Sequence, residues 1–343
     1  MKHRLILTLA AAIAALPSFA CAQMPGRLEW SIDHGERRSD GKVQFTLTYR
    51  EGRNQSIHSH PVGLATLNGL SPEQLRGRRG PVQFTVKEDA GTLDCNGTAG
   101  SGEGDGSCSF AGNQAFVAEL ERQGFGHADD HQLFSLTMMD IGLPMFAEVA
   151  RQGYRGASVA DVIRLREHSV GLDMLREVSA LGYKLPTLGA LADMRDHGVT
   201  TDYIRAVMAN GLGKLTPQEL IDLRDHGVMP DYVAEVRRNG FPDAGVRELI
   251  DMRDHGVSTD YVRELAASGR RFSSDEVVRM RDHGLNAGFV GELREVGYGD
   301  LSADEMIRLR DNGVTVESIR RASAQGGRYS PDELIRMRNE GRI

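Results

Sequence analysis

From about residue 115 to its C-terminus, the chain repeats a pattern of 27–29 residues. The clearest units begin at Thr200, Met229, Ser258, Asn286 and Thr315, so that successive starts are 29, 29, 28 and 29 residues apart. Weaker copies begin near residues 115, 144 and 171, which gives about eight units in all. A period of this length is typical of a solenoid, in which each repeat buries its apolar face only against its neighbours.

Each unit contains the start and stop signals of two short helices. The second helix opens with Ser or Thr followed three residues later by Glu, which is the pattern of a capping box. These pairs are Thr216 with Glu219, Ser273 with Glu276, Ser302 with Glu305 and Ser330 with Glu333. A Gly follows each helix, where a left-handed residue commonly ends the last turn. We therefore expect residues 114–343 to form an α-solenoid of helix–turn–helix repeats.

Residues 23–113 follow a different period. Apolar and polar residues alternate over 28–32, 43–49 and 82–86, which is typical of half-buried strands. The glycine run at 100–106 indicates the tip of a hairpin, and Ser71-Pro-Glu-Gln-Leu75 has the signals of one helical turn. The expected fold class is α+β in two domains: a small antiparallel β domain, either a sandwich or a curled sheet, followed by the α-solenoid.

The first 22 residues have the features of a secretory signal peptide. Lys2 and Arg4 precede an apolar stretch at 5–16, and Ala20-Cys21-Ala22 supplies small residues before a cut at residue 23. The apolar stretch is too short to span a bilayer, and no later stretch is long enough. We expect a periplasmic or secreted protein without an integral membrane segment after cleavage. Lipid anchoring through Cys21 is the alternative, although the residues at 18 and 19 do not fit a lipidation site.

Two cysteines, Cys95 and Cys108, remain after removal of the signal peptide. In an oxidising compartment, two cysteines in one small segment are expected to pair. The alternative is a pair of separate buried thiols. A bridge that closes a loop of about a dozen residues stabilises the fold by up to about 3 kcal/mol on a chain-entropy estimate.

Composition and motifs exclude several classes of function. Lys and Arg number 41 against 48 Asp and Glu, a net charge of −7, which argues against a nucleic-acid partner. The sequence has no zinc, calcium, phosphate-loop or nucleophile-elbow motif. We therefore expect no catalytic residue and no cofactor. His58 and His60 are weak candidates for a metal site, because two ligands alone do not make one.

A row of histidines recurs near the end of the second helix of successive units. Its members are His168, His197, His226, His255 and His283. Metal ligands must converge on one point, whereas a row of this kind spaces its members by about 8–10 Å per packed helix. We expect each ring to bond free carbonyl groups in the last helical turn and to interact favourably with the helix dipole.

A row of arginines runs beside a row of acidic residues in the same units. The arginines are Arg195, Arg224, Arg253, Arg281 and Arg310. The simplest interpretation is a set of ion pairs between repeats, each worth about 0–1 kcal/mol when exposed. The alternative is a binding stripe for a polymer that carries phosphate or carboxylate groups, which the guanidinium fork suits.

The segment Met-Arg-Asp-His-Gly-Val at 252–257, followed by Asp-Tyr-Val-Arg-Glu-Leu at 260–265, resembles repeats of uncharacterised exported bacterial proteins. It is also similar to repeats that follow the peptidase domain of some membrane metallopeptidases of the β-lactam-sensor type. The resemblance covers roughly residues 115–343. The zinc motif and the membrane helices of such a peptidase are absent from this sequence, so the resemblance implies an association with the bacterial envelope and no activity.

These observations predict an exported, non-enzymatic interaction scaffold of the cell envelope. Solenoids present extended surfaces that commonly bind other proteins or peptides, so we expect a protein or peptide partner at the helical repeats. Two alternatives remain open. One is a module that binds a glycan or an anionic envelope polymer through the arginine row or the β domain. The other is a metal-dependent enzyme with its site around His58 and His60.

Overall fold

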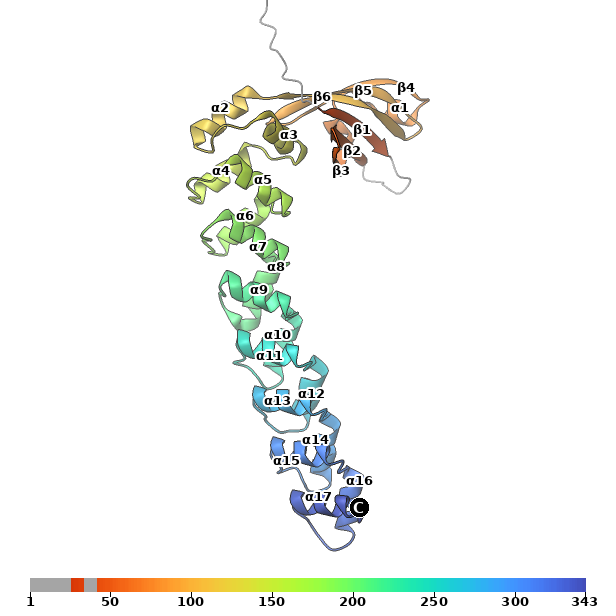
Figure 1. Ribbon diagram of the computed structural model, residues 1–343, viewed down its shortest axis with the longest axis vertical. Coiled ribbons are helices and arrows are strands. Elements are labelled where there is room, and N and C mark those ends of the chain that lie inside the picture. Colours follow the sequence, from red (N-terminus) through yellow and green to blue (C-terminus); the bar gives the residue numbers. More distant parts are fainter. Residues whose placement is uncertain (1–25, 34–41) are drawn as a thin grey trace, which may run out of the picture. The chain divides into compact units, whose positions relative to one another are not determined.

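The computed structural model describes residues 26–33 and 42–343, which form a six-stranded antiparallel sheet followed by a long series of helices (Figure 1). The α+β architecture is as expected. By its internal contacts the chain divides into two compact units, residues 1–166 and 167–343. The predicted signal peptide, residues 1–22 with Cys21, lies outside the described residues.

The six strands belong to one sheet. They are β1 (Arg27–Asp33), β2 (Lys42–Glu51), β3 (Asn54–Gly63), β4 (Gly80–Lys87), β5 (Gly91–Gly100) and β6 (Glu103–Gly112). Their order is β3-β2-β1-β6-β5-β4. Two three-stranded meanders therefore meet where β1 pairs with β6 in antiparallel register, with Trp30 opposite Gly106.

This sheet is curled, so of the two expected forms the sandwich is wrong. The ring of Phe84 on β4 lies 4.9 Å from Trp30 on β1 and 6.1 Å from Phe45 on β2, measured between ring centroids. Neighbouring strands are about 4.8 Å apart, so β2 and β4, which three strands separate, can meet only if the sheet bends over its own inner face. The core of the sheet lies inside this curl, where all three rings are buried.

The glycine run lies mostly within a strand. Only residues 101 and 102 make the turn between β5 and β6, while Gly104 and Gly106 are strand residues next to Trp30. A Cβ atom at Gly106 would lie 2.6 Å from the indole nitrogen of Trp30, and one at Gly104 would lie 2.9 Å from its ring. These two glycines are therefore needed to make room for the buried tryptophan.

Several helices belong to the first unit with the sheet. They are a 3-10 turn (Leu64–Thr66), α1 (Pro72–Arg76), α2 (Gln114–Gln123), α3 (Asp130–Met138), α4 (Leu143–Arg151) and α5 (Val159–Glu167). The predicted turn at Ser71 is α1, which has a capping box between Ser71 and Gln74. Phe134 of α3 packs against Tyr49 and Phe110 of the sheet, each at 5.4 Å between centroids. This packing places the first helices in the same compact unit as the strands.

The second unit is an α-helical repeat. Its helices are α6 (Leu172–Ala180), α7 (Leu188–Asp196), α8 (Thr201–Val207) with a π-helical turn (Met208–Leu212), α9 (Pro217–Asp225), α10 (Pro230–Arg238), α11 (Val246–Asp254), α12 (Thr259–Ala267), α13 (Ser274–Asp282), α14 (Ala287–Glu295), α15 (Ala303–Asp311), α16 (Val316–Ser323) and α17 (Pro331–Asn339). The even-numbered helices from α6 to α16 contact one another in succession, as do the odd-numbered helices from α7 to α17. Each repeat therefore adds one helix to each of two rows.

The predicted helix signals are confirmed in this unit. All four expected capping boxes form, at the N-termini of α9, α13, α15 and α17. Glycines such as Gly198 and Gly227 follow the second helix of a repeat with φ of +72° and +67°, which is the left-handed conformation that favours glycine. The next residue in each case, Val199 or Val228, is fully buried.

In the part of the chain that the structure describes, no single helix is long and apolar enough to cross a membrane. The helices α3 and α4 reach that length and composition only together, as a pair bent by 97°.

Candidate functional site

Three tyrosines of the first helices join the two helices of their repeats. The hydroxyl groups of Tyr203, Tyr232 and Tyr261 donate hydrogen bonds of 2.8, 3.0 and 2.8 Å to backbone carbonyls near the end of each repeat. Burial raises the pKa of each of these hydroxyl groups to about 12. The tyrosines thus act as neutral donors that satisfy carbonyl groups beyond the helix ends.

Members of the arginine row stack on these tyrosine rings. The guanidinium carbon lies 5.0, 5.3 and 5.7 Å from the ring centroid in the pairs Arg224–Tyr203, Arg253–Tyr232 and Arg281–Tyr261. Arg281 also donates a hydrogen bond of 3.0 Å to the carbonyl of Gly256 in the preceding repeat. These three arginines therefore have partners within the chain, whereas Arg195 and Arg310, at the ends of the predicted stripe, take part in no such stack. Anion binding along the row stays a prediction.

The histidine row pairs with the acidic row. This differs from the expected partners, which are helix carbonyls for the histidines and arginines for the acidic residues. Each Nδ1 atom lies 2.6–2.9 Å from a carboxylate oxygen of the next repeat, and not against helix carbonyls. The pairs are His168–Asp196, His197–Asp225, His226–Asp254, His255–Asp282 and His283–Asp311. Three of the arginines stack on tyrosines, and the aspartates accept from imidazoles. The hydrogen bond to Asp225 raises the pKa of His197, as those to Asp254 and Asp282 raise the pKa of His226 and His255.

The residues of the sheet that we singled out are placed as follows. Cys95 and Cys108 face each other across β5 and β6 and form a disulfide. His58 and His60 lie on the same side of β3, opposite Leu47 and Phe45. Burial and the neighbouring His60 lower the pKa of His58. Within residues 26–33 and 42–343, no group of three or more His, Cys, Asp or Glu side chains could hold a metal ion.

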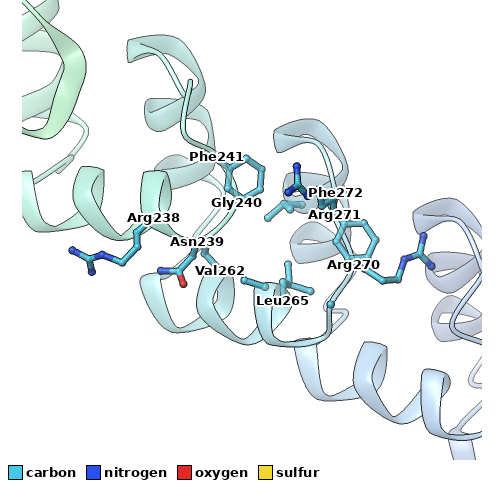
Figure 2. Close-up of a pocket in the computed structure, with 12 residues that line it drawn as sticks. Arg238, Asn239, Gly240, Phe241, Val262, Leu265, Arg270, Arg271 and Phe272 are labelled. Atoms are coloured by element: carbon cyan, nitrogen blue, oxygen red, sulfur yellow. The ribbon is translucent and has the colours of Figure 1, made fainter.

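A half-open pocket of about 250 Å³ lies within the second unit (Figure 2). Its floor is formed by the buried side chains of Val262 and Leu265 on α12 and of Val277 on α13. Its walls are two loops, 239–241 after α10 and 269–272 after α12, which contribute the half-buried rings of Phe241 and Phe272. The pocket is thus an apolar hollow between successive repeats.

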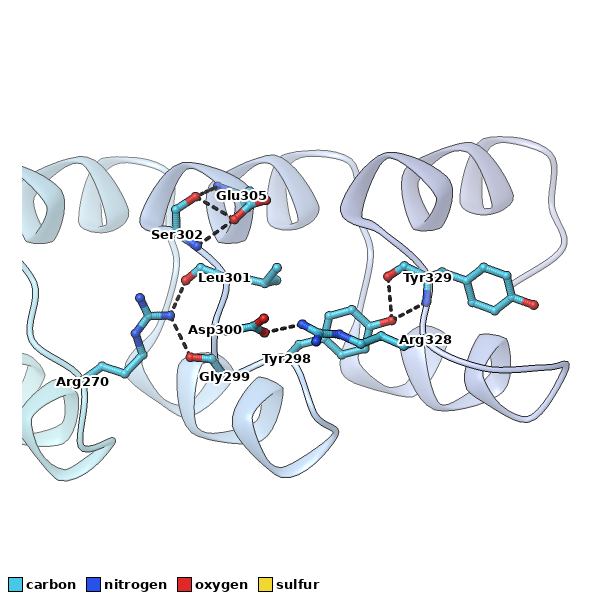
Figure 3. Close-up of polar contacts among 9 residues, drawn as sticks. All are labelled: Arg270, Tyr298, Gly299, Asp300, Leu301, Ser302, Glu305, Arg328 and Tyr329. Carbon is cyan, nitrogen blue, oxygen red and sulfur yellow. Dashed lines mark hydrogen bonds and ion pairs between the residues drawn. The ribbon is translucent and has the colours of Figure 1, made fainter.

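The residue after the glycine that ends the first helix differs between repeats. The residue that follows the glycine at the end of the first helix is Tyr183 in one repeat and Tyr298 in another, and both rings are buried. The corresponding residue after Gly269 is Arg270. Its Nη1 atom donates to the carbonyl of Gly299 at 2.9 Å and to that of Leu301, in the next loop (Figure 3). In the preceding repeat the corresponding residue is Phe241, whose half-buried ring lines the hollow.

The equivalent loop of the next repeat is closed by its tyrosine. The hydroxyl of Tyr298 donates a hydrogen bond of 2.8 Å to the carbonyl of Tyr329 and accepts one of 3.0 Å from its amide (Figure 3). An ion pair between Asp300 and Arg328 lies beside it. Tyr298 holds the position of Phe241, so a buried and hydrogen-bonded tyrosine stands there in place of a half-buried phenylalanine.

Three arginines surround the pocket. Arg238 pairs with Glu235, and Arg270 lies 5.1 Å from the centroid of Phe272 besides donating to the two carbonyls. Arg271 is exposed and forms no ion pair or hydrogen bond with the described residues. None of the residues that line this pocket is acidic, although acidic residues outnumber basic ones in the chain. The pocket was not predicted; the basic pair Arg270–Arg271 in place of the aromatic position is the signal that marks it.

Comparison of the chain with family models and with curated proteins gives no match.

Proposed function

We propose that the chain is an exported, non-enzymatic scaffold of the cell envelope that binds a protein or peptide partner through its helical repeats. The observation that carries this proposal is the apolar pocket on the repeats, which combines half-buried aromatic rings with arginines. Such a combination is typical of the centre of protein interfaces, where aromatic residues and Arg are enriched.

The proposed export from the cytoplasm is supported by separate observations. The N-terminal sequence has the pattern of a secretory signal peptide, and a disulfide between Cys95 and Cys108 is compatible with an oxidising compartment. The polymer-binding alternative has less support, because Arg224, Arg253 and Arg281 stack on tyrosines of the chain itself.

Photo-cross-linking in living cells tests the proposal. A benzophenone amino acid would replace exposed arginines of the repeats, Arg247, Arg263 and Arg321, one at a time, and Ile57 of the sheet as the matched control. We expect discrete, protease-sensitive products from at least one repeat position and none from Ile57. Cross-linked products that only glycosidases degrade would favour the polymer-binding module over the protein-binding scaffold. Products from Ile57 alone, or none at any position, would overturn the proposal.

A further inference from the structure

We propose that the pocket between loops 239–241 and 269–272 binds an acidic peptide segment, with one apolar side chain in the hollow and a neighbouring carboxylate at Arg271. This inference rests on the proposed function, since it names the chemistry of the partner segment that the repeats would bind.

The apolar part of the site accounts for the anchoring side chain. The apolar side chains of Val262, Leu265 and Val277 line the hollow and offer no hydrogen bond to water. The rings of Phe241 and Phe272 stand on either side (Figure 2). A volume of about 250 Å³ accommodates a side chain as large as Leu or Phe. Transfer of such a side chain from water into an apolar site is favourable.

The charges of the site account for the acidic neighbours. Arg271 has an unpaired guanidinium among the described residues, whereas the guanidinium of Arg270 points away from the hollow and donates to the carbonyls of Gly299 and Leu301 (Figure 2). A guanidinium binds a carboxylate through two parallel hydrogen bonds. Because no acidic side chain lines the pocket, an acidic ligand meets attraction without like-charge repulsion from the lining.

A peptide fits this combination better than a charged polymer. A polysaccharide or polyphosphate offers charge but no apolar side chain to fill the hollow, so it would use the arginines and leave the floor in water. A peptide of mixed composition uses both features at once. We therefore take the peptide as the ligand and treat polymer binding as a contrary outcome of the test.

The binding experiment uses the full mature chain and a fluorescein-labelled peptide, Asp-Glu-Phe-Asp-Glu, observed by fluorescence polarisation. Two further peptides separate the contributions. Asp-Glu-Ser-Asp-Glu keeps the charge and removes the anchor, while Lys-Arg-Phe-Lys-Arg keeps the anchor and reverses the charge. We expect the first peptide to bind and each of the others to bind about tenfold more weakly or not at all.

Matched variants locate the binding. Ala266 lines the pocket on α12 and is exposed, whereas its neighbour Ala267 is exposed and does not line it. A266F should fill the hollow and weaken binding about tenfold, and A267F should leave the affinity unchanged. Likewise R271E should weaken binding about fivefold to tenfold, while R321E, which makes the same charge change on exposed α16, should not. Thermal unfolding of each variant verifies that the repeats remain folded.

The outcomes separate this inference from the proposed function. Equal affinity of A266F, R271E and the unchanged chain for the acidic peptide would overturn the pocket inference, as would the absence of binding or a preference for alginate over the peptide. If protein cross-links at the repeats persist in cells in any of these cases, the scaffold proposal stands and only its pocket is wrong. If the cross-links are absent as well, both proposals fail.

Discussion

At the scale of single residues, the hydroxyl groups of three tyrosines bond to backbone carbonyls at the end of their own repeats. The hydroxyl of Tyr232 donates 3.0 Å to the carbonyl of Val257, and both groups are buried. The Y232F variant leaves this carbonyl without a donor. We expect the free energy of unfolding to fall by about 1 kcal/mol, measured by urea denaturation of the full chain.

Two other positions of the chain provide a precedent and a control for this prediction. Phe289 occupies the position of Tyr232 in a later repeat, so the ring itself is tolerated there without a hydroxyl. Tyr329 is the matched control, because its own hydroxyl donates no hydrogen bond to the described residues and only its backbone is bonded (Figure 3). Y329F should therefore leave stability unchanged, and an equal loss in both variants would refute the role given to the hydroxyl.

At the scale of the helix, the histidine–aspartate pairs connect the second helices of successive repeats and make this contact sensitive to pH. Hydrogen bonds to aspartates raise the folded-state pKa of His197, His226 and His255 above the usual value of 6.5. A group whose pKa is raised by folding stabilises the fold fully below its unfolded pKa and loses that contribution as pH rises through the folded value.

We therefore expect the urea concentration at the midpoint of unfolding to decrease as the pH rises above about 6.5. The triple variant H197N, H226N and H255N should show a smaller fall. Asparagine is a suitable replacement, because Asn312 occupies this position in a later repeat and bonds back to the carbonyl of Arg308 at 2.8 Å. A pH dependence that persists unchanged in the triple variant would show that other groups cause it.

The helix ends give a second prediction at this scale, in which the same substitution acts with opposite signs. Gly198 has a φ of +72°, and a Cβ atom there would lie 2.8 Å from a guanidinium nitrogen of Arg224. G198A should destabilise the repeats by about 1–2 kcal/mol. Gly291 lies inside α14 with nothing within 4 Å of the added atom, so G291A should stabilise them by about 0.5–1 kcal/mol. Calorimetric unfolding of both variants measures the two effects, and a loss of stability in G291A would contradict the assignment.

At the scale of the whole molecule, local sequence signals predicted the helices and strands. The contacts between distant residues could not be predicted from such signals. The capping box of Thr216 with Glu219 and the glycines after each helix were readable because the residues that interact are three or four positions apart. The partner of His226 could not be predicted from the sequence. Asp254 lies 28 residues away, and nearby backbone carbonyls are alternative partners for the same imidazole.

The candidate site shows the same limit. The loop 269–272 could be recognised as a departure from the repeat, but a pocket depends on which side chains fill the space between two loops. Phe241 and Phe272 are 31 residues apart in the sequence, and the packing of α10 against α12 brings the loops that carry them to one hollow. In the sheet, likewise, alternation predicted the strands while the contact between Phe45 and Phe84 determines the curl.

The disulfide gives the prediction that belongs to this scale. Trp30, the single tryptophan of the chain, is buried in the sheet next to β6, so its fluorescence reports the strands, whereas far-ultraviolet circular dichroism is dominated by the helices. Reduction of Cys95–Cys108 frees a loop of 13 residues and should cost up to about 3 kcal/mol. We expect the midpoint of the Trp30 thermal transition to fall by up to roughly 10 °C, while the dichroism transition moves less, because repeats are stabilised mainly by their nearest neighbours. The C95S and C108S double variant should reproduce the effect without reductant.

Equal shifts of the fluorescence and dichroism transitions would instead mean that strands and repeats unfold as one cooperative unit. An unchanged Trp30 transition would mean that the bridge adds nothing to the stability of the sheet.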